Sequence, residues 1–345
     1  MDALSDVLRN VRLSGAVFFD IQAAEPWVAT TPNGRAIVDR IFPGGADHLI
    51  PYHVITRGSC WAGLPGGESV RLSEGDIIVF PHGDSHSMSS APGMQTSPNL
   101  SIYRRPAEGR LPFTMAMGAD NTPESTHLVC GYLGLDARPY NPLLAALPKV
   151  IRVNDRVGGS LHAYVQLAIA ESKNARPGDE AVLTRLSELM FVEVVRRYSD
   201  TLPAERTDWL AGLRDAAIGR AITELHRNPA REWSLQSLAR EVGVSRSVLA
   251  ERFTQFVGRP PMQYLTNWRI QLAASELLSG TDSVAVVANR VGYDSEAAFS
   301  RAFKKLTGEP PSDWRKRRNG KALSEQRPSA VSNHAKRQGS RPSVR

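Results

Sequence analysis

Two sets of five side chains, spaced alike and 50 residues apart, have chemistry that suits contact with DNA. Arginine can donate two hydrogen bonds to guanine, and glutamate can accept one from cytosine. If each set lies on one face of a helix, it can reach base edges in a major groove. The two sets are Arg246, Ser247, Ala250, Glu251 and Thr254, and then Glu296, Ala297, Ser300, Arg301 and Lys304.

The segments that carry these sets repeat the same apolar and turn residues. The first copy has Leu235, Ala239, Gly243, Leu249, Phe253, Phe256, Gly258, Pro260, Pro261 and Tyr264. The second copy has Val284, Ala288, Gly292, Phe299, Phe303, Leu306, Gly308, Pro310, Pro311 and Trp314. A repeat carried by both core and turn positions indicates two copies of one supersecondary unit. Two short helices around a tight turn predict a helix-turn-helix in each copy.

Capping residues mark where these helices are expected to begin and end. In the first copy, Ser234 precedes a helix at Leu235–Glu241, and Ser245 precedes one that runs to about Val257. In the second copy, Ser283 precedes Val284–Arg290, and Asp294 or Ser295 precedes a helix that runs through Thr307.

Helical geometry separates the inward from the outward side chains of each second helix. At about 100° per residue, the apolar residues of each helix share one face, and Ala250 and Ser300 lie at its flank. The residues that point away from it are Ser247, Glu251, Thr254, Ala297, Arg301 and Lys304. Contact with a DNA groove is one interpretation of these outward faces. The other is that Glu251 and Arg301 form solvated surface or i,i+4 ion pairs.

A longer helix is predicted between the two copies, from Pro261 to Leu278. Two helices that enter successive major grooves on one face of DNA must lie about 34 Å apart. A rigid helical spacer meets that requirement, whereas a Gly/Ser linker would not.

The C-terminal sequence resembles the AraC/XylS family of transcription regulators. The stretch Gly258–Leu265 with Trp268-Arg269 is similar to the family's spacer, and Phe299–Lys305 with Gly308–Arg315 is similar to its C-terminal signature. The chain departs from the family at Glu309-Pro310, and Ser247 and Ala250 are smaller than usual. The resemblance implies a regulator that binds double-stranded promoter DNA, and RNA polymerase as a partner if it activates.

The N-terminal part has short β-prone stretches separated by turn residues, which predict an antiparallel barrel or sandwich. These stretches are Ala16–Ile21, Arg35–Phe42, His53–Trp61, Ser69–Leu72, Asp76–Phe80 and Leu100–Tyr103. The segment Gly75–His86 has the spacing G-x5-P-x-G-x2-H and resembles a cupin motif. Residues 128–148 look like the cupin-type sensor that precedes some AraC-type domains, which implies a small-molecule effector.

Three histidines and one cysteine of this part are candidate metal ligands. His53, His82, His86 and Cys130 have the donor atoms that a zinc site needs. The usual cupin set is incomplete, because the strand around His53 has one histidine and no matching carboxylate. The alternative is that the histidines make hydrogen bonds and that Cys130 is a core residue.

Charge is concentrated at the C-terminus of the 345-residue chain, whose net charge is +7. Residues 316–345 hold nine Lys and Arg against the single acid Glu325, so this segment alone carries +8. It predicts a disordered tail, either simply solvated or acting as a phosphate-attracting arm.

We therefore expect an α+β multidomain protein: a cupin-like antiparallel β-barrel, a helical linker and an all-α domain with two helix-turn-helix units. Residues 158–172 and 179–198 are predicted to form linker helices, and the apolar stripe of the second packs in the core or forms a homodimer interface. The expected divisions are 1–150, 151–207, 208–315 and 316–345.

The sequence shows no secretory signal and no apolar run that could span a membrane, which indicates a cytoplasmic protein. The expected function is non-enzymatic, sequence-specific regulation of transcription. Two alternatives stay open: a cupin metalloenzyme such as a dioxygenase or isomerase, and an architectural protein that binds through its basic tail.

Overall fold

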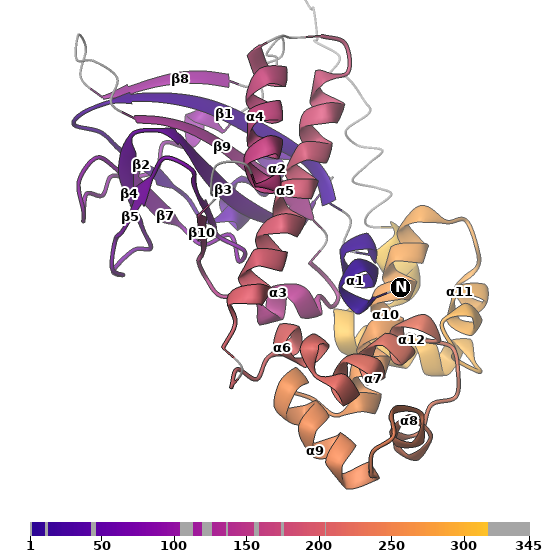
Figure 1. Cartoon of the computed structure of the whole chain (residues 1–345). Coiled ribbons are helices and arrows are strands. Elements are labelled where there is room, and N and C mark those ends of the chain that lie inside the picture. Colours follow the sequence, from indigo (N-terminus) through magenta and orange to yellow (C-terminus); the bar gives the residue numbers. More distant parts are fainter. Residues whose placement is uncertain are drawn as a thin grey trace, which may run out of the picture.

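A computed structural model describes residues 2–10, 13–42, 46–103, 113–118, 126–135, 137–154, 159–173, 176–203 and 205–316. A strand-rich N-terminal part and a helical C-terminal part lie on either side of a small helix, α3 (Pro142–Ala146) (Figure 1). The predicted basic tail, apart from Lys316, lies outside the described residues. In the described part, no helix is both long enough and apolar enough to cross a membrane.

The strands form two open sheets. The larger has the order β10-β6-β3-β9-β1-β8 and the smaller the order β2-β7-β4-β5. Their bounds are β1 (Leu13–Ala24), β2 (Val28–Thr31), β3 (His48–Arg57), β4 (Ser59–Gly63), β5 (Val70–Ser73), β6 (Asp76–Val79), β7 (His86–Ser89), β8 (Phe113–Gly118), β9 (Thr126–Leu135) and β10 (Ile151–Asn154). A closed barrel is not confirmed, and the sheet is not wholly antiparallel because β8 pairs parallel to β1.

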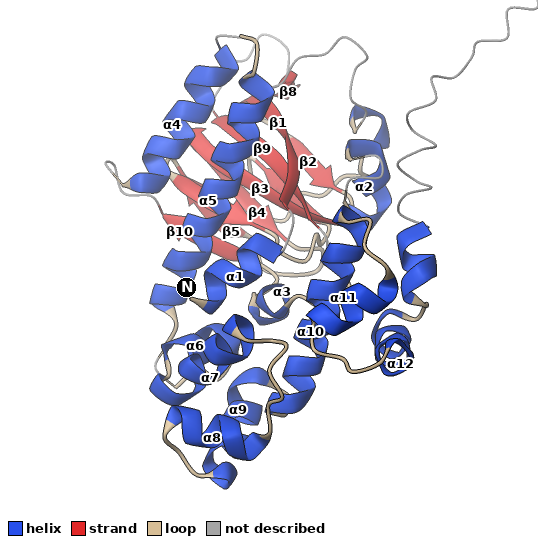
Figure 2. Ribbon diagram, turned by 90° about the vertical axis from the view of Figure 1, so that its right-hand side faces the viewer, coloured by secondary structure: helices blue, strands red, loops and turns tan. Residues whose placement is uncertain are grey.

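Strand β3 shows how the larger sheet places side chains on its two faces. It lies between β6 and β9, so its backbone is hydrogen-bonded on both edges. Tyr52 points to the outer face, where its hydroxyl lies 3.0 Å from Ser187 Oγ on the covering helix α5 (Asp179–Thr201). Because side chains alternate along a strand, His53 points to the inner face. Figure 2 shows α5 and α4 (Ser160–Lys173) lying across the outer face.

Two predicted strands are short helices instead. Residues Arg35–Phe42 belong to α2 (Gly34–Ile41), because Asn33 accepts a hydrogen bond from the Arg35 amide and begins a helix. The buried residues Ile37, Val38 and Ile41 have helical rather than alternating spacing. Residues Leu100–Tyr103 form a 3-10 turn, η1 (Leu100–Ile102), which Asn99 caps in the same way.

The helical part confirms the predicted helix-turn-helix units and their caps. Its helices are α6 (Trp209–Arg214), α7 (Ala216–Arg227), α8 (Leu235–Val242), α9 (Arg246–Val257), α10 (Pro261–Ser279), α11 (Val284–Arg290) and α12 (Glu296–Thr307). Ser234, Ser245 and Ser283 accept backbone N–H bonds at the predicted helix starts, and Ser295 rather than Asp294 caps α12. The N-terminal helix α1 (Ala3–Asn10) packs against α7.

The apolar core has two parts. One continuous cluster runs from the sheets through α5 and α6 to α9 and the first half of α10. A separate cluster joins the second half of α10 to α11 and α12. The first helix-turn-helix unit therefore shares its core with the N-terminal part, whereas the second has a core of its own.

Candidate nucleic-acid interface

Helices α9 and α12 are built alike from the sequence upward. Each has 12 residues, and their first residues, Arg246 and Glu296, are 50 positions apart. Serine caps each start, and each ends at a glycine in the left-handed region, Gly258 with φ 73° and Gly308 with φ 86°. Glycine adopts this conformation without a Cβ penalty, so the chain can turn sharply after each helix.

The structure brings each predicted set onto one outward face. Leu249 and Phe253 of α9, and Phe299 and Phe303 of α12, are fully buried. The five positions of each set have the same pattern, four exposed side chains and one half-buried one, Ala250 and Ser300 respectively. Within the described part of the chain, neither Arg301 nor Lys304 forms an ion pair with another side chain. Both cations are therefore available to a partner.

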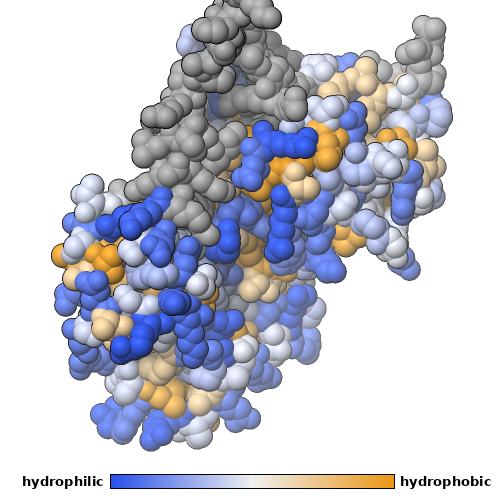
Figure 3. Space-filling model, turned by 180° about the vertical axis from the view of Figure 1, so that it is seen from behind, coloured by the Kyte–Doolittle hydropathy of each residue, from blue (hydrophilic) through white to orange (hydrophobic). Residues whose placement is uncertain are grey.

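The two outward faces differ in how freely their side chains can bind. On α9 the Thr254 hydroxyl donates to the Ala250 carbonyl at 2.7 Å, and Ser247 Oγ lies 3.1 Å from Ser245 Oγ. These contacts hold short side chains close to the helix, so Arg246 and Glu251 are the long side chains of this face. Figure 3 shows a helical half covered mainly by hydrophilic side chains with apolar ones scattered between them.

Helix α9 is fixed from two sides, in part by Arg252, Asp215 and His226, which no sequence motif marks. Arg252 forms an ion pair with Asp215, the N-cap residue of α7. On the inner side, Tyr264 of α10 accepts a hydrogen bond from Trp209 Nε1 at 3.0 Å and lies 2.7 Å from His226 Nε2. The His226 ring stacks on Trp268, and burial lowers its pKa to about 3. The ring is therefore neutral, and its Nε2 shares a hydrogen bond with the Tyr264 hydroxyl.

The N-terminal part contacts this framework through Tyr140. Its backbone N–H donates to the buried side chain of Gln271 on α10 at 2.9 Å. Its ring lies edge-on to Tyr264, and the Arg259 guanidinium lies 4.8 Å from its centre. Tyr140 and Gln271 are 131 residues apart, and neither showed a pattern from which this contact could be predicted.

Three of the four candidate metal ligands lie together between the sheets. His53 Nδ1 is 2.7 Å from Cys130 Sγ, and His53 Nε2 is 2.7 Å from His86 Nε2. His82 lies apart, where its Nε2 donates to the Leu147 carbonyl at 2.9 Å. Cys130 and His86 contact opposite nitrogens of His53, so the three donors do not converge on one point.

The described residues contain no group of three or more His, Cys, Asp or Glu side chains that could hold a metal ion. The zinc hypothesis is therefore not supported, and the hydrogen-bonding alternative fits the geometry. Burial lowers the pKa of His86 to about 4 and that of His53 well below its usual value, so both rings are neutral.

The Asp84 carbonyl fixes the donor and acceptor at each step of the hydrogen-bonded series formed by Cys130, His53 and His86. Since the Asp84 carbonyl can only accept, His86 Nδ1 donates to it, and His86 Nε2 must accept from His53 Nε2. His53 Nδ1 is then an acceptor, and the Cys130 thiol donates to it. Burial raises the pKa of this thiol well above its usual value.

A small apolar cavity lies beside the hydrogen-bonded series of Cys130, His53 and His86, between the two sheets. Its volume is about 50 Å³. The walls include Trp27, Met88, Leu128 and Tyr132, and the polar groups that reach it include His53 and Cys130. The cavity suits an uncharged and mainly apolar occupant.

Comparisons with known proteins agree with this two-part layout. A cupin family model matches residues 2–200, and a helix-turn-helix domain model matches residues 238–317. A Streptomyces lividans protein described as an AraC-like transcription regulator is 31% identical over 319 residues, which cover 92% of this chain and 98% of that one. The RCS-specific transcriptional activator RclR of Escherichia coli K12 is 29% identical over 323 residues, covering 92% and 98%.

Solved structures include the DNA-binding domain of AdpA in complex with a target DNA. It is 25% identical, covers 34% of this chain and 99% of that one, and superposes with a TM-score of 0.29. The family model that spans more than half of the chain and the relatives that match it nearly end to end lead to one conclusion. The chain belongs to the AraC-like transcription regulators, which bind DNA through a helix-turn-helix domain.

Proposed function

We propose that α9 and α12 enter successive major grooves on one face of promoter DNA. The observation that carries this proposal is the matched pair of outward faces, with equivalent positions 50 residues apart and the same exposure at each. A single exposed polar helix is ordinary protein surface. Two helices that agree position for position are what a bipartite DNA site requires.

The two helices differ in the contacts that they offer. Arg301 can donate two hydrogen bonds to guanine, Lys304 can contact a phosphate, and Glu251 can accept from cytosine N4. Ser247 and Ala250 are short, so the segment under α9 depends more on shape and phosphate contacts. The operator segment under α12 is therefore read more strictly.

Selection of bound sequences from a random DNA pool, with and without candidate effectors, tests this function. The expected product is a motif of two segments whose centres are about one helical turn apart. Failure to enrich any motif at low and moderate salt would overturn the proposal.

We also propose that the cavity between the sheets binds a small-molecule effector. The walls are mainly apolar, and the neutral His53–Cys130 pair offers no charge to an ionised ligand. A cavity of about 50 Å³ must enlarge to admit more than a very small molecule. The flexible side chains of Met88, Met115 and Met117 in its walls permit this.

Filling the cavity is expected to abolish the response to the effector and to leave DNA binding intact. Met88→Trp adds a bulky ring where the walls now leave space, and it lies far from α9 and α12 in the sequence. The response is measured with a promoter reporter, and DNA affinity by fluorescence anisotropy. A variant that keeps the full response would place the effector elsewhere.

We further propose that the α4–α5 hairpin mediates homodimer formation. Leu167, Val182 and Leu189 are 57%, 43% and 46% exposed, and Val182 and Leu189 are two turns apart on one face of α5. Leu167→Glu with Leu189→Glu is expected to convert a dimer into a monomer in sedimentation experiments. An unchanged dimer would contradict this interface.

RNA polymerase is a further partner if the protein activates transcription.

A further inference from the structure

Arg269 of α10 makes three hydrogen bonds to backbone carbonyls of two separate turns. Its Nε donates to the Pro229 carbonyl at 2.7 Å, and Nη2 donates to the Arg231 carbonyl at 2.9 Å. Its Nη1 donates to the Gly292 carbonyl, also at 2.9 Å. The first two acceptors precede α8 in the first helix-turn-helix unit, and the third lies in the turn of the second unit.

This side chain stands where the two units meet. Trp268 belongs to the core of the first unit and Ile270 to the separate core of the second. Beside Arg269, a cavity of about 510 Å³ lies between the units, bordered by Trp233 on one side and Asn289 on the other. The units leave a space here. Their mutual orientation depends on α10, on Leu272 and Leu306, which pack against both cores, and on the contacts around Arg269.

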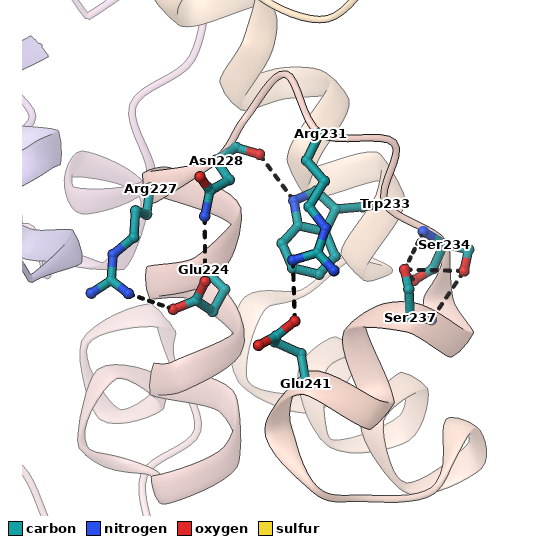
Figure 4. A network of polar contacts seen from close by, with 8 residues as sticks. All are labelled: Glu224, Arg227, Asn228, Arg231, Trp233, Ser234, Ser237 and Glu241. Atoms are coloured by element: carbon teal, nitrogen blue, oxygen red, sulfur yellow. Dashed lines mark hydrogen bonds and ion pairs between the residues drawn. The ribbon is translucent and has the colours of Figure 1, made fainter.

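Further contacts hold the turn at residues 229–231, whose carbonyls accept hydrogen bonds from Arg269, in place (Figure 4). The Arg231 guanidinium lies 4.0 Å from the centre of the Trp233 ring and 3.1 Å from a Glu241 carboxylate oxygen. Trp233 Nε1 donates to the Asn228 carbonyl at 3.0 Å, and Ser234 with Ser237 forms a capping box at the start of α8. The carbonyls of Pro229 and Arg231 are thus fixed relative to the first unit.

The opposite turn touches the first one directly. Gly292 has a φ of 89°, and a Cβ there would lie 2.6 Å from Ala230 Cα. Only glycine fits so close to another backbone. The same turn leads through Tyr293 and Asp294 into α12. A shift at Gly292 would therefore move α12 relative to α9.

We propose that Arg269 is a positioning residue that sets the separation and rotation of α9 relative to α12. It thereby sets which spacing between the two operator segments the protein accepts. This inference rests on the proposed binding of both helices to one DNA site. One inserted base pair moves the segments by about 3.4 Å and 34° relative to each other, so rigid units should reject it.

Arginine suits this role better than lysine. Its planar guanidinium presents five N–H donors in a fixed arrangement, and three of its nitrogens bond to carbonyls here. Lysine has a single ammonium group and cannot reproduce this geometry. We therefore expect Arg269→Lys and Arg269→Met to loosen the connection between the two turns.

The test measures the affinity of the full chain for its selected operator and for versions with one base pair added or removed between the segments. Wild type is expected to lose about tenfold for either change, as for a mismatched base pair. Arg269→Met and Arg269→Lys should bind the native spacing several-fold more weakly but lose less than about threefold on altered spacing. Gly292→Ala, which pushes the turns apart, should weaken the same preference.

Arg290→Met is the matched control. Arg290 pairs with Glu276 and Asp282 in the second unit only, so this variant should keep the spacing penalty of wild type. Circular dichroism checks that each variant is folded. If the Arg269 variants are unfolded, the spacing preference is tested with Gly292→Ala instead. Equal weakening at every spacing would overturn the role of Arg269. A wild type indifferent to spacing would instead overturn the proposed two-groove function.

Discussion

Replacing Arg301 with alanine is expected to weaken operator binding by about 1–3 kcal/mol and to relax specificity at a single base pair. The side chain is exposed on α12 and forms no ion pair in the described part of the chain, so the loss reflects contact with DNA rather than with the protein. The measurement is a set of affinities for operators changed at one base pair each, for wild type and for Arg301→Ala.

Two further variants make this result specific. Glu251→Ala, at the equivalent position of α9, should alter the other operator segment only. Removal of residues 317–345, which carry much of the positive charge, should weaken binding to all sequences alike and reduce its salt dependence. If deletion of the tail abolished binding and Arg301→Ala changed nothing, the protein would be architectural rather than sequence-specific.

The free energy of unfolding is expected to fall steeply as the pH drops below about 6.5, the ordinary histidine pKa. Burial lowers the pKa of His53, His86 and His226 in the folded chain, so the unfolded chain binds more protons below that pH. Stability present above pH 6.5 is therefore lost on acidification. Each histidine contributes about 1.4 kcal/mol per pH unit once its unfolded form is protonated.

Denaturant unfolding at a series of pH values measures this slope. His226→Phe keeps a ring stacked on Trp268 but cannot bind a proton, so it should reduce the slope by one histidine's share. The same reduction is expected for His86→Gln in the N-terminal part. A slope that neither variant changes would show that these rings are not neutral in the folded protein.

Local signals predicted the helical part of the fold well. Serine caps, glycine turns and the spacing of apolar residues such as Phe253 and Phe303 all lie within, or next to, the helix that they define. The strand predicted at Arg35–Phe42 is wrong because the prediction relied on β-prone residue types, whereas the spacing of Ile37, Val38 and Ile41 and the cap at Asn33 make this segment a helix. The outcome depends on a hydrogen bond from the Arg35 backbone N–H to the Asn33 side chain, which composition does not reveal.

Contacts between distant segments could not be predicted in this way. Tyr140 meets Gln271, and Arg269 meets Pro229, only because the chain returns to these places after many residues. The sequence identified His53, His86 and Cys130 as a group, but their donor directions depend on the register of β3 with β9, in which His53 lies opposite Cys130. That register brings His53 and Cys130 together, and a hydrogen bond joins their side chains.

Site-directed cleavage of DNA tests the central claim most directly. Ser247→Cys and Ala297→Cys place a thiol at equivalent positions of α9 and α12, and the two native cysteines are buried. Each variant is labelled with an iron chelate that cuts nearby DNA and is then bound to the selected operator. Two cleavage centres about 10 base pairs apart on one face of the duplex are predicted. A single centre, or centres on opposite faces, would contradict the binding of both helices to successive major grooves.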